Sequence, residues 1–70
     1  MKIKWKDGFT IKVNVLADKS VVIAANKEGL QSLAMQLNDL ANEYIGNHFH
    51  YDEYTSLEDG SCELIIEKIG

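Results

Sequence analysis

The sequence predicts an α+β domain in which one helix packs on one face of a five-stranded, mainly antiparallel sheet, in the order βββαββ. Three observations lead to this prediction. Apolar and polar residues alternate at both ends of the chain, apolar residues recur with a helical period in the middle, and turn-forming residues separate the segments. With 70 residues, the chain has room for a single domain, which we expect to span residues 1–70.

The first part of the chain is expected to form a three-stranded meander. Three segments either alternate apolar with polar residues or are apolar on both faces, as strands are: residues 2–6, 9–15 and 20–25. Asp7-Gly8, a strong hairpin signal, separates the first two strands, and residues 17–19 form a second tight turn.

The middle of the chain is expected to be a helix that buries one stripe against the sheet. Asn26 is a suitable N-cap, Glu28 lies in the first turn, where the helix dipole favours an anion, and Gly46 is a suitable stop. The expected stripe consists of apolar or aromatic residues at helical spacing: Leu30, Leu33, Ala34, Leu37, Leu40, Ala41 and Tyr44.

Two further strands, over residues 48–55 and 62–69, are expected after the helix, with a turn at Asp59-Gly60 between them. The third and fifth strands are apolar on both faces, so we place them centrally, in the sheet order 1-2-3-5-4. Since one helix covers one face of a sheet, some residues of an apolar set, or the residues opposite them, must look outward: Val21, Ile23, Ile65 and Ile69. Such an open face favours docking of another protein or formation of a homodimer.

Composition and charge narrow the function classes. The net charge is −4 and all seven basic residues are lysines, so the chain lacks the arginines and the basic surface that nucleic-acid binding needs. Residues 21–70 carry nine acidic residues against two lysines, a net charge of −7, which favours a basic protein partner. No apolar run is long enough to span a membrane. The single cysteine, Cys62, fits a cytoplasmic location.

The most suggestive local motif is His48-x-His50-x-Asp52, because residues two apart on a strand share a face. Two imidazoles and a carboxylate are possible zinc ligands, yet a full metal site needs a further ligand that the spacing does not supply. We therefore expect no cofactor and an exposed protein-binding strand instead. The candidate partner-binding residues are His48, His50, Asp52, Tyr54 and Glu63. A metal- or ligand-binding domain that uses His48, His50 and Asp52 remains the alternative.

An enzyme is not expected. The chain has no nucleophile elbow and no glycine-rich phosphate loop, since its glycines are isolated at expected turns and helix ends. We expect a binding protein that acts without catalysis.

The C-terminal half also resembles a known family. Three stretches carry the resemblance: Leu33-Ala-x-x-Leu37-x-x-Leu40-Ala, Gly46-x-His48-x-His50-x-Asp52 and Leu57-x-x-Gly60-Ser61-x-Glu63-Leu-Ile-Ile66. Over residues 27–68 the chain resembles the bacterial immunity protein 32 family of polymorphic toxin systems. The resemblance implies an α+β binding protein that neutralises a toxin by direct contact. The acidic charge of residues 21–70 favours a basic target such as a nuclease. The resemblance also implies a set of signature positions: His48, His50, Asp52, Gly60, Ser61 and Glu63.

Overall fold

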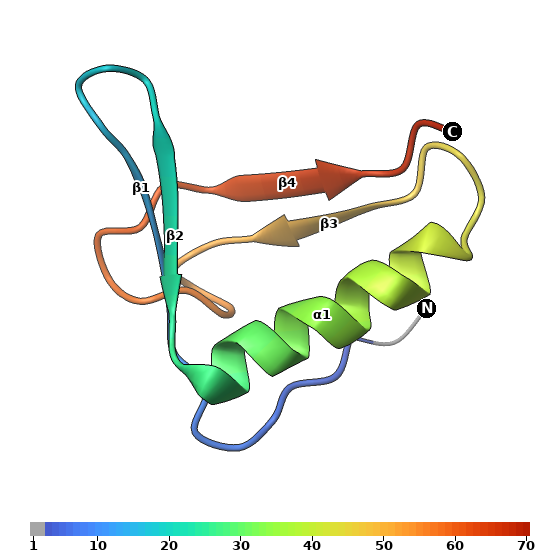
Figure 1. Ribbon diagram of the computed structural model, residues 1–70, viewed down its shortest axis with the longest axis horizontal. Helices are drawn as coiled ribbons and strands as arrows, with labels where there is room; N and C mark the ends of the chain where they lie inside the picture. Colours follow the sequence, from blue (N-terminus) through green and yellow to red (C-terminus); the bar gives the residue numbers. More distant parts are fainter. Residues whose placement is uncertain (1–2) are drawn as a thin grey trace.

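A computed structural model describes residues 3–70 and contains one helix and two antiparallel hairpins (Figure 1). The elements in chain order are β1 (Ile11–Val15), β2 (Val21–Ala25), α1 (Lys27–Ala41), β3 (His48–Tyr51) and β4 (Leu64–Glu67). β1 pairs with β2 and β3 pairs with β4 in two separate sheets. The predicted α+β class is confirmed, but the prediction of a single five-stranded sheet is wrong.

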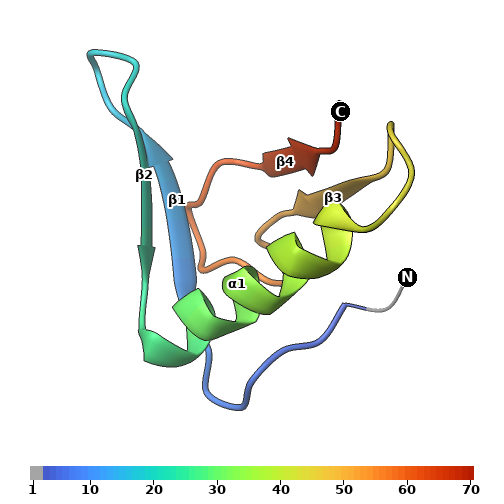
Figure 2. The same ribbon diagram turned by 45° about the vertical axis from the view of Figure 1, so that its right-hand side comes forward.

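The expected first strand is replaced by an extended segment that runs alongside α1 (Figures 1 and 2). Two polar side chains of α1 form hydrogen bonds with the backbone of this segment. The Lys6 N–H donates to Ser32 Oγ at 2.9 Å, and Gln36 Nε2 donates to the Lys4 carbonyl at 2.7 Å. These bonds satisfy groups that a neighbouring strand would otherwise satisfy. Met1 and Lys2, which belong to the same expected strand or directly precede it, lie outside the described residues.

The predicted turns form, and glycines occupy the left-handed positions in two of them. Gly8 has φ +80° and Gly60 has φ +84°, conformations that glycine adopts without steric cost. Between β1 and β2, the Leu16 N–H donates to the Ser20 carbonyl at 2.8 Å. Hydrogen bonds from Ser20 to the Asp18 carboxylate lower the pKa of Asp18 in this turn.

The expected strand order is also wrong, because β2 lies at an edge rather than in the centre. On the far side of β1 from β2 lies the connection to β4. Glu58 N–H donates to the Ile11 carbonyl and Cys62 N–H to the Val13 carbonyl, both at 2.8 Å. Residues 58–62 therefore occupy the outer edge of β1, and β2 keeps an open edge.

Helix α1 begins as predicted and buries a different stripe from the expected one. Asn26 caps it, with its side-chain oxygen accepting from the Gly29 N–H at 2.8 Å. The buried helix residues are Gly29, Ser32, Leu33, Gln36 and Leu40. Several residues of the expected stripe are exposed instead: Leu30, Ala34, Leu37, Ala41 and Tyr44. The helix is rotated because Ser32 and Gln36 bond the N-terminal segment, and this rotation turns Leu37 outward.

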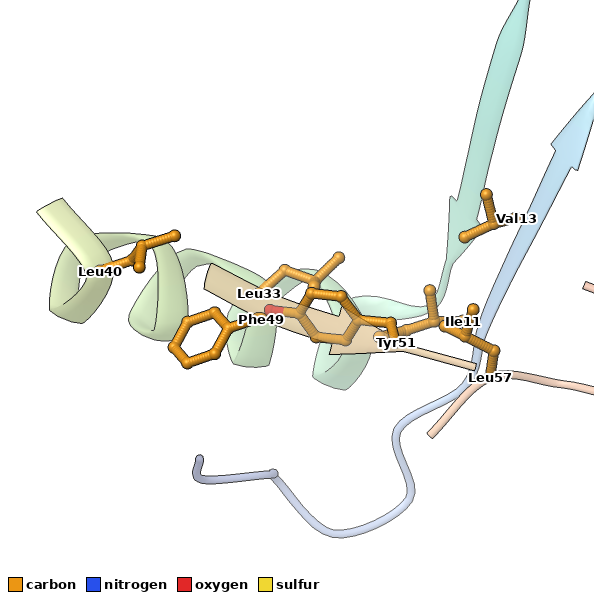
Figure 3. Close-up of a cluster of buried hydrophobic side chains, with 7 residues drawn as sticks. All are labelled: Ile11, Val13, Leu33, Leu40, Phe49, Tyr51 and Leu57. Carbon is orange, nitrogen blue, oxygen red and sulfur yellow. The ribbon is translucent and has the colours of Figure 1, made fainter. Parts of the chain in front are cut away.

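The core lies where α1, β1 and β3 meet. Its buried residues come from both hairpins, the helix and the connection after β3 (Figure 3): Ile11, Val13, Leu33, Leu40, Phe49, Tyr51 and Leu57. Trp5 and Phe9 close the core from the N-terminal side, stacked with ring centroids 4.3 Å apart. Gly29 lets the helix approach β1, because a Cβ there would lie 2.6 Å from the Thr10 carbonyl oxygen.

Within residues 3–70, no helix is both long and apolar enough to cross a membrane.

Candidate partner-binding surface

Strand β3 turns its two histidines away from the core. Its residues alternate between exposed and buried, so Phe49 and Tyr51 point into the core (Figure 3). His48 and His50 therefore face outward. Burial of a row of aromatic rings on one side thus places the imidazoles on the solvent side, as the sequence predicted.

The two imidazoles form an ordered pair. Their ring centroids are 4.8 Å apart, with an interplanar angle of 70°. His48 Nδ1 lies 3.0 Å from the Gly46 carbonyl oxygen, and His50 Nδ1 lies 3.4 Å from Glu63 Oε2. Since both of these oxygens accept, the geometry favours Nδ1–H donors and leaves each Nε2 facing solvent or a partner.

Acidic and apolar residues of β4 complete this face. Glu67 is the cross-strand partner of His48, and Ile65 is the partner of His50. The side chains of His50 and Glu63 are 51 % and 55 % exposed, so the contact between them is screened by water and contributes little to folding. We call this set the histidine face: His48, His50, Glu63, Ile65 and Glu67.

Asp52 does not belong to the histidine face, although the motif spacing suggested it. The strand ends at Tyr51, and Asp52 Oδ1 accepts from the Tyr54 N–H, the Thr55 N–H and the Thr55 hydroxyl at 2.9–3.1 Å. The Asp52 carbonyl also accepts from the backbone N–H of Leu57 at 2.8 Å. Asp52 therefore builds the turn that places Leu57 in the core.

The signature positions Gly60 and Ser61 are scaffold residues as well. The Gly60 N–H donates to Glu53 Oε2 at 2.9 Å, and Ser61 Oγ accepts from the Val13 N–H at 3.1 Å. Ser61 thus satisfies an edge group of β1 and fixes where the chain enters β4. Of the residues singled out by sequence, His48, His50 and Glu63 form the surface, while Asp52, Gly60 and Ser61 hold it in place.

Tyr54 extends the candidate surface beyond β3. Its side chain is 89 % exposed at the tip of the turn after the strand. A tyrosine offers contact area and a hydrogen-bonding hydroxyl at low entropic cost, which is why tyrosines are enriched in interfaces.

The histidine face offers only part of a metal site. Each imidazole has one nitrogen available, but no group of three or more His, Cys, Asp or Glu side chains in the described part of the chain is placed to hold an ion. Cys62 is exposed and precedes β4, where its backbone N–H, rather than its thiol, makes the contact with β1.

A buried polar network supports the histidine face from below. Tyr51 is fully buried and its hydroxyl donates to Gln36 Oε1 at 2.8 Å, while Gln36 Nε2 bonds the Lys4 carbonyl. Burial raises the pKa of Tyr51 to about 12. The network ties β3, α1 and the N-terminal segment together, so the strand that carries the histidines is rigidly seated.

Sequence reasoning missed a second exposed surface. The sequence indicated that some of Val21, Ile23, Ile65 and Ile69, or the residues opposite them, would look outward, and all four are exposed. It did not indicate that Val15, Leu16 and Val22 at the end of the β1–β2 hairpin would be exposed too, or that Leu30 and Leu37 would be. The available signal was that β2 is apolar on both faces.

Comparison with known families agrees with this anatomy. The model of the family described as Immunity protein 32 matches residues 20–69, which include β2, α1, β3, β4 and the whole histidine face. Neither a curated protein nor a solved structure matches the chain. A match over fifty of the seventy residues places the chain in that family. The chain therefore belongs to the immunity protein 32 family.

Proposed function

We propose that this protein neutralises a toxin by binding directly to its catalytic domain, without catalysis of its own. The observation that carries the proposal is the family match over residues 20–69, which covers the surface that the fold leaves exposed beside its rigid core. An immunity protein needs a stable surface that excludes substrate from its target, and such a function makes no demand for a deep pocket.

The histidine face and Tyr54 are the proposed contact region. β3 holds His48 and His50 outward over a buried aromatic underside, so the partner meets an ordered surface and little conformational entropy is lost on binding. Imidazole, carboxylate and phenol groups supply hydrogen-bond donors and acceptors, and Ile65 adds apolar area. Tyr54 is the proposed anchor, and Asp52 acts by shaping the turn beneath it.

The charge of this region favours a basic partner. Residues 52–67 carry six carboxylates and no lysine: Asp52, Glu53, Glu58, Asp59, Glu63 and Glu67. A nuclease attracts phosphate to its active site with positive charge, so an acidic surface can compete for the same site and steer association. We propose a nuclease domain as the target and the cytoplasm as the compartment in which the complex forms.

The test has two steps: the genes beside this one are searched for a toxin with a C-terminal nuclease domain, and that domain is then co-expressed with this protein. Wild-type protein should restore growth to cells that express the toxin, and the two purified proteins should form a complex that weakens with salt. The matched variants are His50→Ala/Tyr54→Ala on the proposed surface and Lys27→Ala on an exposed helix position away from it.

The double variant should weaken binding by at least tenfold with an unchanged melting temperature, while Lys27→Ala should bind as wild type. Growth rescue without a complex would contradict inhibition by binding. Tight binding by His50→Ala/Tyr54→Ala would move the contact region away from the histidine face.

A further inference from the structure

The open edge of β2 presents backbone groups to solvent. The bonds from Leu16 N–H to the Ser20 carbonyl and from Asn26 N–H to the Thr10 carbonyl show which opposed residues of the hairpin are hydrogen-bonded pairs and which are not. In an antiparallel pair, hydrogen-bonded and non-bonded positions alternate, so Val21 and Ile23 direct their N–H and C=O groups away from β1. No other part of residues 3–70 bonds these groups, and no element lies beside this edge in Figure 1 or Figure 2.

This edge has none of the devices that usually prevent strand pairing. β2 reads Val-Val-Ile-Ala-Ala, without a charge, a proline or a bulge. Its side chains are exposed on both faces, with Val21 at 58 % and Ile23 at 42 % on one face and Val22 at 38 % on the other. An apolar strand of this kind is favourable in water only when another strand covers it.

The overall dimensions show that the molecule is more open than a compact monomer of its mass. The accessible surface is 4915 Å², against about 4,400 Å² expected for a compact monomer of this mass. The radius of gyration is 12.3 Å, against about 11 Å expected. The excess of roughly 500 Å² approaches the area that each partner contributes to a small interface, about 600 Å² or less.

We propose that β2 pairs antiparallel with β2 of a second copy, about a two-fold axis at Ile23. In this register Ile23 exchanges hydrogen bonds with Ile23 of the second copy, and Val21 with Ala25. Val21 lies opposite Ala25 on one face, and Val22 lies opposite Ala24 on the other. Each valine therefore packs against the small side chain of an alanine. No charged residue of β2 opposes another, because the strand contains none.

The fold favours a closed dimer over a growing filament. Pairing joins β1 and β2 of both copies into one sheet, whose outer edges are the β1 strands. Each β1 edge is already bonded by residues 58–62 through Glu58, Ser61 and Cys62. A third copy therefore has no open edge in this sheet, as a two-fold interface requires. The histidine face lies on the other hairpin, so this proposal is independent of the proposed function.

A charge-swap experiment tests whether two copies pair about a two-fold axis at Ile23. Wild-type protein should sediment at twice the 7.9 kDa chain mass at high micromolar concentration. Ile23→Lys and Ile23→Glu should each be monomeric, because like charges meet at the axis. Their equimolar mixture should recover the dimer. The matched control is Ile65→Lys, which replaces a similarly exposed isoleucine on β4 and should stay dimeric.

If the charged variants fold poorly, two single-cysteine variants of β2 test the proposed register between the two copies. In a Cys62→Ser background, Ile23→Cys should form an intermolecular disulfide, because directly opposed Cα atoms at a hydrogen-bonded position lie about 5.5 Å apart. Val22→Cys should cross-link at least tenfold more slowly, since position 22 of one copy lies opposite Ala24 of the other. A monomeric wild type at millimolar concentration, or equal cross-linking by both variants, would overturn the proposal.

Discussion

The two hairpins bury their residues according to different rules. β3–β4 follows simple alternation: Phe49 and Tyr51 are buried while His48 and His50 are exposed. β1–β2 buries Ile11 and Val13 near the helix, but its far end is apolar on both faces and uncovered. The difference shows that a strand with a polar outer face, such as β3, needs only its inner face covered, and the chain itself covers that face. A strand that is apolar on both faces, such as β2, keeps apolar surface that the described part of the chain does not cover.

The largest effect is expected on α1, the helix that packs against both hairpins. Leu33 is 8 % exposed and packs in the core, so Leu33→Ala should lower the free energy of unfolding by about 2–5 kcal/mol. Leu37 is 43 % exposed, and Leu37→Ala should cost less than about 1 kcal/mol. Urea unfolding of both variants measures the difference. Equal losses would mean that the outward stripe of α1 is buried after all.

The burial of Tyr51 on the inner side of β3 can be tested through the pH dependence of the free energy of unfolding. Tyr51 keeps its proton to about pH 12 in the folded state, while in the unfolded chain it ionises near pH 10. Between these values the unfolded state binds fewer protons, so stability should fall by about 1.4 kcal/mol per pH unit. Urea unfolding at pH 9 and pH 11 should show this loss in wild type. The loss should be smaller in Tyr51→Phe, and parallel curves would place the tyrosine in solvent.

The attachment of the β1–β2 hairpin to the helix is tested at Gly29. An added Cβ would lie 2.6 Å from the Thr10 carbonyl oxygen and 2.9 Å from Ile11 Cγ1. Gly29→Ala should therefore destabilise the fold by about 1–3 kcal/mol in urea unfolding, although alanine favours helix formation. The matched control is Gln31→Ala, on the exposed side of the same helix, which should change the free energy of unfolding little. A Gly29→Ala variant as stable as wild type would show that helix and hairpin are farther apart.

The smallest effect is expected on the outer side of β3. His48→Ala/His50→Ala should change the free energy of unfolding by less than about 0.5 kcal/mol, because both imidazoles are exposed. Zinc should leave the melting temperature of wild type unchanged, since two imidazoles alone offer a weak site. A zinc-dependent rise of several degrees that disappears in the double variant would establish a metal site instead.

The amount that sequence could predict differs between elements. The Asn26 cap, the turns at Gly8 and Gly60 and the outward histidines depend on local chemistry, and each was predicted correctly. The first strand was not, because its alternation suits pairing with a strand and packing against a helix equally well. Asp52 was misplaced because the motif spacing does not reveal that β3 ends at Tyr51, directly before Asp52 and four residues before the expected end at residue 55.

The sequence by itself determined the α+β class, the start of the helix at the Asn26 cap, the polarity of β3 and the family resemblance, because caps, turns and periodicity act between neighbours along the chain. Only the tertiary structure decided which stripe of α1 is buried and which edge of the sheet stays open. Ser32 and Gln36 turn toward the core to bond the backbone of Lys4 and Lys6, and residues 58–62 occupy the outer edge of β1. Both outcomes depend on hydrogen bonds between residues far apart in sequence, which no local pattern encodes.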